Sequence, residues 1–150
     1  MAVAHTRSKP RQVAPSASDR MRGIRQRGTA PELAVRSALS TIGLRYRLND
    51  RRVPGSPDLF NKSRQFAVFV HGCFWHRHAG CFRSTFPRTN ATFWRAKFRA
   101  NVRRDARKAD QLRSLGYAVF VVWECETEDA LGLQRKLRRA FSKERILTRR

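Results

Sequence analysis

The segment from Val68 to Cys81 constrains the fold most, because an apolar run leads directly into a loop rich in metal-binding residue types. Residues 66–70 have the length and the β-branched and aromatic content of a buried strand. The only other cysteine, Cys125, follows a second apolar run at residues 117–123. We therefore expect two strands to end side by side at one metal. The histidines and cysteines that follow the first run are His71, Cys73, His76, His78 and Cys81.

Three sulfur ligands and one nitrogen ligand suit a closed tetrahedral zinc site. Such a site leaves no position for a substrate, so we expect one structural zinc ion that contributes on the order of 10 kcal/mol to folding. His71 and His76 are rival ligands that the spacing alone does not exclude, and a set of buried thiols without metal is the plainer alternative. The ligands favoured by the sequence are Cys73, His78, Cys81 and Cys125.

Charge indicates the partner. The chain has 150 residues with 33 Lys and Arg against 11 Asp and Glu, and its isoelectric point is about 11.8. This fits one domain with a modest core and a strongly positive surface, for which nucleic acid is the expected partner. Arginine pairs with phosphate through two parallel hydrogen bonds, which strengthens that interpretation. A ribosomal protein or a merely very soluble basic protein is the alternative.

Other compositional features bear on the compartment. No run approaches the ~20 apolar residues of a membrane span, and the N-terminus lacks the apolar segment of a secretory signal. Three cysteines, an odd number, favour metal ligands or free thiols over a disulfide framework. We therefore expect an intracellular, cytoplasmic protein without membrane contact.

The pattern of the chain predicts an α/β fold with a mixed sheet and helices on its faces. Residues 1–17 are expected to form a disordered basic tail, residues 18–142 the folded domain, and residues 143–150 a frayed basic end. A capping box at Thr29 and Glu32 begins a helix that Gly43 ends. Short strands are expected at residues 44–48, 58–60, 65–71 and 117–123, with 58–60 and 65–71 forming a hairpin.

A long helix is expected over residues 92–115, and a last helix begins at Thr127 or Asp129 and reaches about Phe141. The apolar face predicted for the long helix carries Phe93, Ala96, Phe98, Val102, Ala106, Ala109 and Leu112.

Asp58 is the first candidate catalytic residue. It begins a strand that pairs with the strand leading to His71, a layout in which a carboxylate can hold Mg²⁺ against a phosphate. The backbone carbonyl of Val70, waters and phosphate oxygens could complete the coordination. A Pro-Asp pair taken alone is more often a turn.

Several short motifs are distributed between residues 18 and 125. They are Met21-Arg-Gly-Ile-Arg25, Thr29-Ala-Pro-Glu32, Gly43-Leu-Arg-Tyr-Arg47, Pro54-Gly-Ser-Pro-Asp58, Phe69-Val-His-Gly-Cys-Phe-Trp-His76, Thr92-Phe-Trp94, Asn101-Val-Arg-Arg-Asp105 and Val121-Val-Trp-Glu-Cys125. Together they resemble the very short patch repair (Vsr) endonucleases, bacterial enzymes that nick DNA 5′ of the T in T:G mismatches left by deaminated 5-methylcytosine. The resemblance implies a restriction-endonuclease-like fold in which Phe69-x-His71 replaces the usual acidic-x-Lys element.

The resemblance also implies catalytic roles. Asp58 and the Val70 carbonyl would bind Mg²⁺, as two ions, while His76 activates the attacking water and His71 orients a metal-bound water. Glu32 and Asp105 would support the site from two helices. Each role has a structural alternative: His76 a zinc ligand, His71 a core histidine, Glu32 a helix cap only, and Asp105 a surface ion pair.

Phe74 and Trp75 point to mismatch recognition, because two large aromatics in a metal-fixed loop can wedge between base pairs, and a T:G pair costs less to unstack than a matched pair. The resemblance adds Met21 from the other groove and Trp94 as a support for the loop. Met21 as a hydrophobic staple and Trp94 as a core residue are the alternatives. Assignment of Cys81 requires that Ala79 and Gly80 be accommodated as a turn.

Two other functions remain open: a zinc-stabilised module that binds mismatches without cutting, and a nuclease of different specificity. The joint presence of Asp58, His71 and His76 disfavours the first, and the aromatic pair disfavours the second. The expected partner is double-stranded DNA with a T:G mismatch. The resemblance implies mismatch-repair proteins and a cytosine methyltransferase in the same cell, and nucleoid association. We expect a monomer, since a mismatch has no two-fold symmetry.

Overall fold

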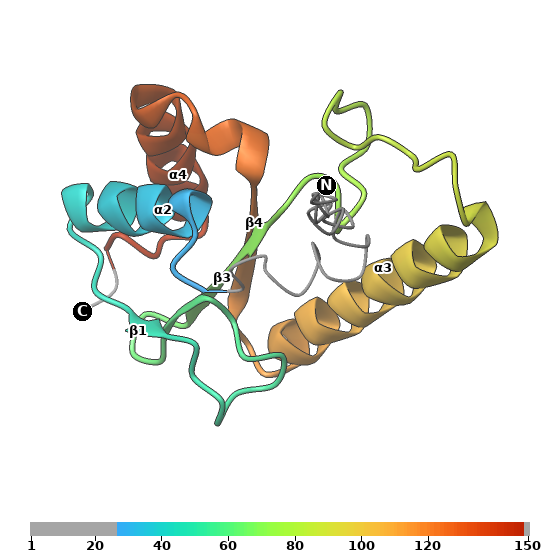
Figure 1. The fold of residues 1–150 in the computed structure, drawn as a ribbon. Coiled ribbons are helices and arrows are strands. Elements are labelled where there is room, and N and C mark those ends of the chain that lie inside the picture. Colours follow the sequence, from blue (N-terminus) through green and yellow to red (C-terminus); the bar gives the residue numbers. More distant parts are fainter. Residues whose placement is uncertain (1–26, 149–150) are drawn as a thin grey trace, which may run out of the picture.

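The computed structural model describes residues 27–148 (Figure 1). Met21 and the predicted N-terminal tail lie outside the described residues.

A four-stranded sheet has the order β1-β2-β3-β4. Strand β1 pairs with β2, and β2 with β3, in antiparallel orientation, whereas β3 and β4 are parallel. The predicted mixed α/β class is confirmed. The strands are β1 (Arg47–Leu48), β2 (Leu59–Asn61), β3 (Phe66–His71) and β4 (Ala118–Trp123); the helices are α2 (Ala30–Thr41), α3 (Ala91–Ser114), α4 (Ala130–Lys143) and the short 3₁₀ helix η1 (Glu124–Thr127).

Side-chain alternation along the strands produces a core on each face of the sheet. Helices α2 and α4 lie together on one face, and the long helix α3 lies on the other (Figure 1). The larger core, on the α2 and α4 side, includes Leu59, Phe66, Val68, Val122, Leu133, Leu137 and Phe141. The smaller core, on the α3 side, includes Phe60, Ala67, Phe69 and Leu112.

Helix α2 begins with the predicted cap. The backbone N–H of Glu32 donates to the Thr29 hydroxyl at 3.4 Å, and the Glu32 carboxylate accepts from that hydroxyl and from the Gly28 N–H, the latter at 2.8 Å. Glu32 is 9% exposed, so its carboxylate is buried as well as capping the helix. Helix α2 ends where Gly43 takes the left-handed conformation, with φ of +79°.

The face that helix α3 turns inward is only partly the one predicted, because Phe98, Ala109 and Leu112 are buried as expected. Phe93 and Val102 are exposed by 53% and 46%, and Ala96 and Ala106 are also exposed, so that part of the prediction is wrong. The buried residues are Trp94, Phe98, Ala109 and Leu112. The half-buried Asn101, Asp105 and Lys108 share that face. Hydrophobic periodicity misleads here because the middle of α3 packs against polar groups.

One smaller expectation is wrong, and another is confirmed. The strand expected at residues 44–48 is confined to Arg47–Leu48, and Leu44 is buried in the larger core. The last helix begins after Asp129, whose side chain accepts from the Gly132 N–H at 3.0 Å. No helix within residues 27–148 is long and apolar enough to cross a membrane.

The chain stays packed beyond α4. Ile146 is fully buried in the larger core, and the Arg64 guanidinium donates to the carbonyls of Ile146 and Leu147, each at 3.2 Å. The expected fraying from residue 143 is therefore wrong as far as Leu147, because an apolar pair among basic residues completes the core.

Ile146→Ala is expected to lower the free energy of unfolding by about 2–5 kcal/mol, since it opens a cavity in the core. Leu131→Ala, at a position that is 64% exposed, is the control and should change stability by less than about 0.5 kcal/mol. Urea denaturation measures both, and equal effects would contradict the packing of this segment.

Candidate active site and metal centre

The α3-facing side of the sheet is apolar in its middle and polar at one end. Asp58 and His71 stand two residues from Phe60 and Phe69, so alternation places all four on this side. Because β2 and β3 are antiparallel, the start of β2 lies beside the end of β3. The Val70 N–H donates to Asp58 Oδ2 at 2.7 Å, which fixes the carboxylate against the strand.

Burial raises the pKa of Asp58, and the nearby Glu32 carboxylate adds to that increase. The Val70 N–H, His76 and Lys108 oppose it. Two carboxylates close together in a half-buried place repel each other, and a cation bound between them would relieve the repulsion. The Asp58 carboxylate, with the Glu32 carboxylate near it, therefore fits a divalent cation.

His71, His76 and Asp105 form a second cluster, with one ligand atom from each lying within 4.8 Å of the others. The two imidazole rings stack, with centroids 4.0 Å apart and planes 7° from parallel. His76 Nδ1 lies 2.5 Å from Asp105 Oδ2. A carboxylate at Nδ1 favours the tautomer with the proton on Nδ1, which leaves Nε2 able to accept a proton.

The charge states of this cluster differ from one residue to the next. Burial, followed by the neighbouring His76, lowers the pKa of His71 to about 4, so His71 is neutral at pH 7. Burial acts to raise the pKa of Asp105, but its hydrogen bond with His76 and nearby positive charges, including Arg104, lower it overall. His76 is thus held between a neutral imidazole and a carboxylate.

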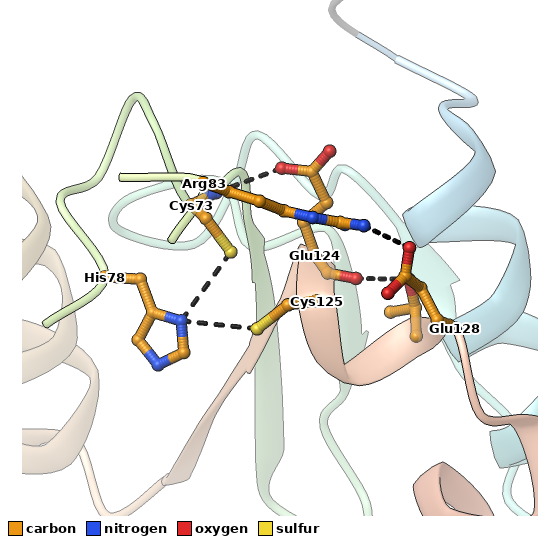
Figure 2. Close-up of polar contacts among 7 residues, drawn as sticks. Cys73, His78, Arg83, Glu124, Cys125 and Glu128 are labelled. Carbon is orange, nitrogen blue, oxygen red and sulfur yellow. Dashed lines mark hydrogen bonds and ion pairs between the residues drawn. The ribbon is translucent and has the colours of Figure 1, made fainter. Parts of the chain in front are cut away.

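The four residues predicted to bind zinc also come together. Ligand atoms of Cys73, His78, Cys81 and Cys125 all lie within 4.8 Å of one another, and the group could hold a metal ion. His78 Nδ1 lies 3.6 Å from the sulfur of Cys73 and 3.3 Å from that of Cys125 (Figure 2). The His78 ring stacks on Trp123 with centroids 4.3 Å apart.

Thiolate ligands need a cation in this place. Burial raises the pKa of the Cys73 thiol to about 12, whereas the Arg83 N–H lowers that of Cys81. Metal binding removes the thiol proton and supplies the compensating charge.

A single backbone conformation separates the two histidine roles. Arg77, between His76 and His78, has φ of +57°, in the left-handed region that side chains other than glycine seldom occupy. His76 then points to Asp105 and His78 to the sulfur group. The Arg77 guanidinium holds this turn, donating to the Thr85 carbonyl at 2.9 Å and lying 4.8 Å from the centre of the Phe98 ring.

Polar groups connect the loop that carries Cys73, His78 and Cys81 to the end of β4. The Cys73 N–H donates to the Glu124 carboxylate at 3.1 Å, and Arg83 pairs with Glu128 across η1 (Figure 2). The Thr127 hydroxyl donates to the Glu124 carbonyl at 2.7 Å. The loop that carries His76 is therefore bound to β4 by both side-chain and sulfur contacts.

Phe74 is half-buried inside an aromatic cluster. Its ring centre lies 5.0 Å from that of Trp75, 5.5 Å from that of Trp94 and 5.2 Å from that of Phe98. Trp94 is 9% exposed, which places it beneath the loop. Trp75 is also half-buried, and its carbonyl accepts from the Asn101 amide at 3.0 Å.

Three residues of this region were not predicted to contribute: Asn101, Lys108 and Glu124. Asn101 and Lys108 stand four residues before and three after Asp105, so they share its helical face, and that spacing could have found them. Glu124 adjoins Cys125 in sequence, but only the structure shows its bond to Cys73.

Comparison with known proteins agrees with this geometry. The family described as DNA mismatch endonuclease Vsr matches residues 13–82. The Type II nicking enzyme V.XorIIP of Xanthomonas oryzae pv. oryzae is 45% identical over 118 residues, which cover 79% of this chain and 86% of that enzyme. The DNA mismatch endonuclease Vsr of Escherichia coli strain K12 is 42% identical over 108 residues, covering 72% of this chain and 69% of that protein. The chain belongs to the Vsr family.

The predicted resemblance is thereby confirmed. A member of the Vsr family is a DNA endonuclease, a hydrolase with DNA as its partner and a place in mismatch repair. The restriction-endonuclease-like fold of the Vsr family agrees with the mixed sheet described above.

The two clusters make a testable distinction between the histidines of one loop. His78→Gln is expected to lower the metal content of the purified protein, because it removes a member of the sulfur group. His76→Gln should leave the content unchanged, since His76 bonds to Asp105. Elemental analysis by mass spectrometry measures the metal bound per chain. Loss of metal in His76→Gln with retention in His78→Gln would overturn the assignment.

Proposed function

We propose that the chain nicks DNA on the 5′ side of the T in T:G mismatches that arise from deaminated 5-methylcytosine. The observation that carries the proposal is the His76–Asp105 pair, which lies against His71 at the same end of the sheet as Asp58. Family membership supports DNA as the substrate. The name of the E. coli relative refers to mismatches, and that of the Xanthomonas relative to nicking.

In the proposed reaction, His76 acts as the general base. Its Nε2 accepts a proton from a water as the water oxygen bonds to phosphorus, and the bond from phosphorus to the leaving 3′ oxygen breaks in line. Asp105 stabilises the imidazolium that forms. Positioned general bases contribute typically ~10²–10⁴-fold to rate.

His71 has a different part in the proposal. Because it is neutral at pH 7, it can donate or accept a hydrogen bond from water without adding charge. Its stacking on His76 also keeps the second ring in place. Glu32 serves both as a cap of α2 and as the second carboxylate near Asp58.

Asp58 and the Val70 carbonyl would hold Mg²⁺, with Glu32 close by. The raised pKa of Asp58 fits this assignment, since it reflects burial and a neighbouring carboxylate that a cation would offset. Bound there, Mg²⁺, as two ions, would neutralise charge on the phosphate oxygens.

Zinc is the ion proposed for Cys73, His78, Cys81 and Cys125. Three sulfurs and one nitrogen match its tetrahedral preference and leave no position for a substrate, so its role is structural. Its contribution is to fix the loop that carries both His76 and the aromatic pair.

Phe74 and Trp75 are proposed to wedge between base pairs at the mismatch, with Trp94 supporting them from α3. Their cluster is stiffened by ring contacts and by Asn101, so little order has to be imposed when DNA binds. A rigid wedge selects the pair that is easiest to unstack, which favours T:G over T:A. Met21 from the other groove, a monomeric enzyme and coupling to mismatch-repair proteins and a cytosine methyltransferase complete the proposal.

Labelled duplexes with T:G or T:A at one position test this function. Single-strand cutting that requires Mg²⁺ is expected only beside the T of T:G, and Asp58→Ala should lower its rate by at least about 10²-fold, because it removes the ligand for the cation. Sequencing gels resolve the position of the cut.

The alternatives give different results. Equal cutting of both duplexes would indicate a nuclease of other specificity, and tight T:G binding without cutting would indicate a binding module. Either result would overturn the proposed function.

A further inference from the structure

The catalytic end of the sheet has an excess of negative groups for a site that must accept a phosphate. Three carboxylates gather there, those of Asp58, Glu32 and Asp105. A phosphodiester carries a negative charge that grows on its non-bridging oxygens during transfer, so fixed positive charge beside it lowers the barrier. Cations held at Asp58 would provide part of this charge, and a side chain could provide more.

Lys108 is placed to do so. It lies on the inward face of α3, one turn after Asp105, and is half-buried despite its charge. Its aliphatic stem crosses the turn that leads to Asp58: a Cβ on Gly55 would lie 2.8 Å from Lys108 Cβ, 2.9 Å from Cγ and 3.2 Å from Cδ. Gly55, with φ of +79°, thus leaves room for this stem.

The direction of the side chain is indicated by its neighbours. Gly55 stands three residues before Asp58, and Asp105 one helical turn before Lys108 bonds to His76, so the Lys108 side chain lies between the turn that leads to Asp58 and the helical turn that holds His76. Within residues 27–148, no hydrogen bond or ion pair engages the Lys108 ammonium group, whereas the Asp105 carboxylate is engaged by His76. Lys108 is therefore available to a negatively charged ligand at the catalytic end of the sheet.

We propose that Lys108 is a further catalytic residue, whose ammonium group contacts a non-bridging oxygen of the scissile phosphate while its stem rests on Gly55. The inference rests on the proposed function for its substrate and deepens it. The ammonium group stabilises charge during the reaction, and it neither gives nor takes a proton.

Lys108→Met separates the charge from the stem, because methionine keeps an unbranched apolar chain and loses the ammonium group. The rate of single-turnover nicking at saturating T:G duplex should fall about 10²-fold. Lys108→Arg keeps a positive charge and should restore part of the rate. Lys62→Met is the matched control, because Lys62 is exposed in the turn between β2 and β3, at the opposite end of the hairpin from Asp58 and His71.

A second measurement does not depend on cutting. The affinity for duplex DNA without Mg²⁺ is measured against salt concentration, and the loss of one phosphate contact should reduce the slope of log affinity against log salt by about 0.9. Lys62→Met should keep the slope of the unsubstituted protein. Urea denaturation checks that each variant remains folded.

The outcomes separate the two proposals. Lys108→Ala removes both the charge and the stem. If Lys108→Met nicks and binds like the unsubstituted protein, the catalytic role is overturned, and impairment of Lys108→Ala alone would then show that only the stem matters. If the unsubstituted protein cuts T:G and T:A equally, mismatch specificity fails while the comparison for Lys108 proceeds on either duplex. If it cuts neither, the proposed function fails, and an unchanged salt slope in Lys108→Met would then overturn the phosphate contact as well.

Discussion

Parallel pairing of β3 with β4 is the constraint on which the rest of the site depends. The register sets His71 opposite Trp123, so both strands end together, and the loops that follow leave from one edge. One loop carries Cys73, and the other begins with Glu124 and Cys125, which bind it through a backbone hydrogen bond and the sulfur group. A shift of this register would separate the sulfur ligands and move His76 away from α3.

Helix α3 gives the second half of the site through its spacing. Phe98, Asn101, Asp105, Lys108 and Leu112 recur every three or four residues and so lie along one face. In chain order, Phe98 packs in the aromatic cluster, Asn101 donates to the Trp75 carbonyl and Asp105 pairs with His76. The Lys108 stem then lies against the turn before Asp58, and Leu112 packs in the smaller core. Recognition, catalysis and stability are thus aligned on a single rigid element, which keeps their relative positions fixed.

Sequence patterns predicted the elements whose signals are local or strictly periodic. The cap of α2, the hairpin of β2 and β3, and the convergence of Cys73 and Cys125 follow from capping chemistry, turn residues and parallel strand ends. The inward face of α3 was predicted correctly at Phe98, Ala109 and Leu112 but incorrectly at Phe93 and Val102, because the helix meets polar groups along its middle. Ile146 was missed because a buried residue after a basic helix has no periodic neighbours to mark it.

The spacing of the loop alone could not decide which of His76 and His78 joins the sulfur ligands, because this depends on the left-handed backbone of Arg77. That conformation directs one imidazole to a carboxylate and the other to sulfur, and the central claim is that the first pair acts as a unit. Single-turnover rates of His76→Ala, Asp105→Ala and the double variant on a T:G duplex test this most directly. The account predicts that the double variant is no slower than His76→Ala, since Asp105 acts through His76. Rate losses that multiply would show that the two residues act independently and would contradict it.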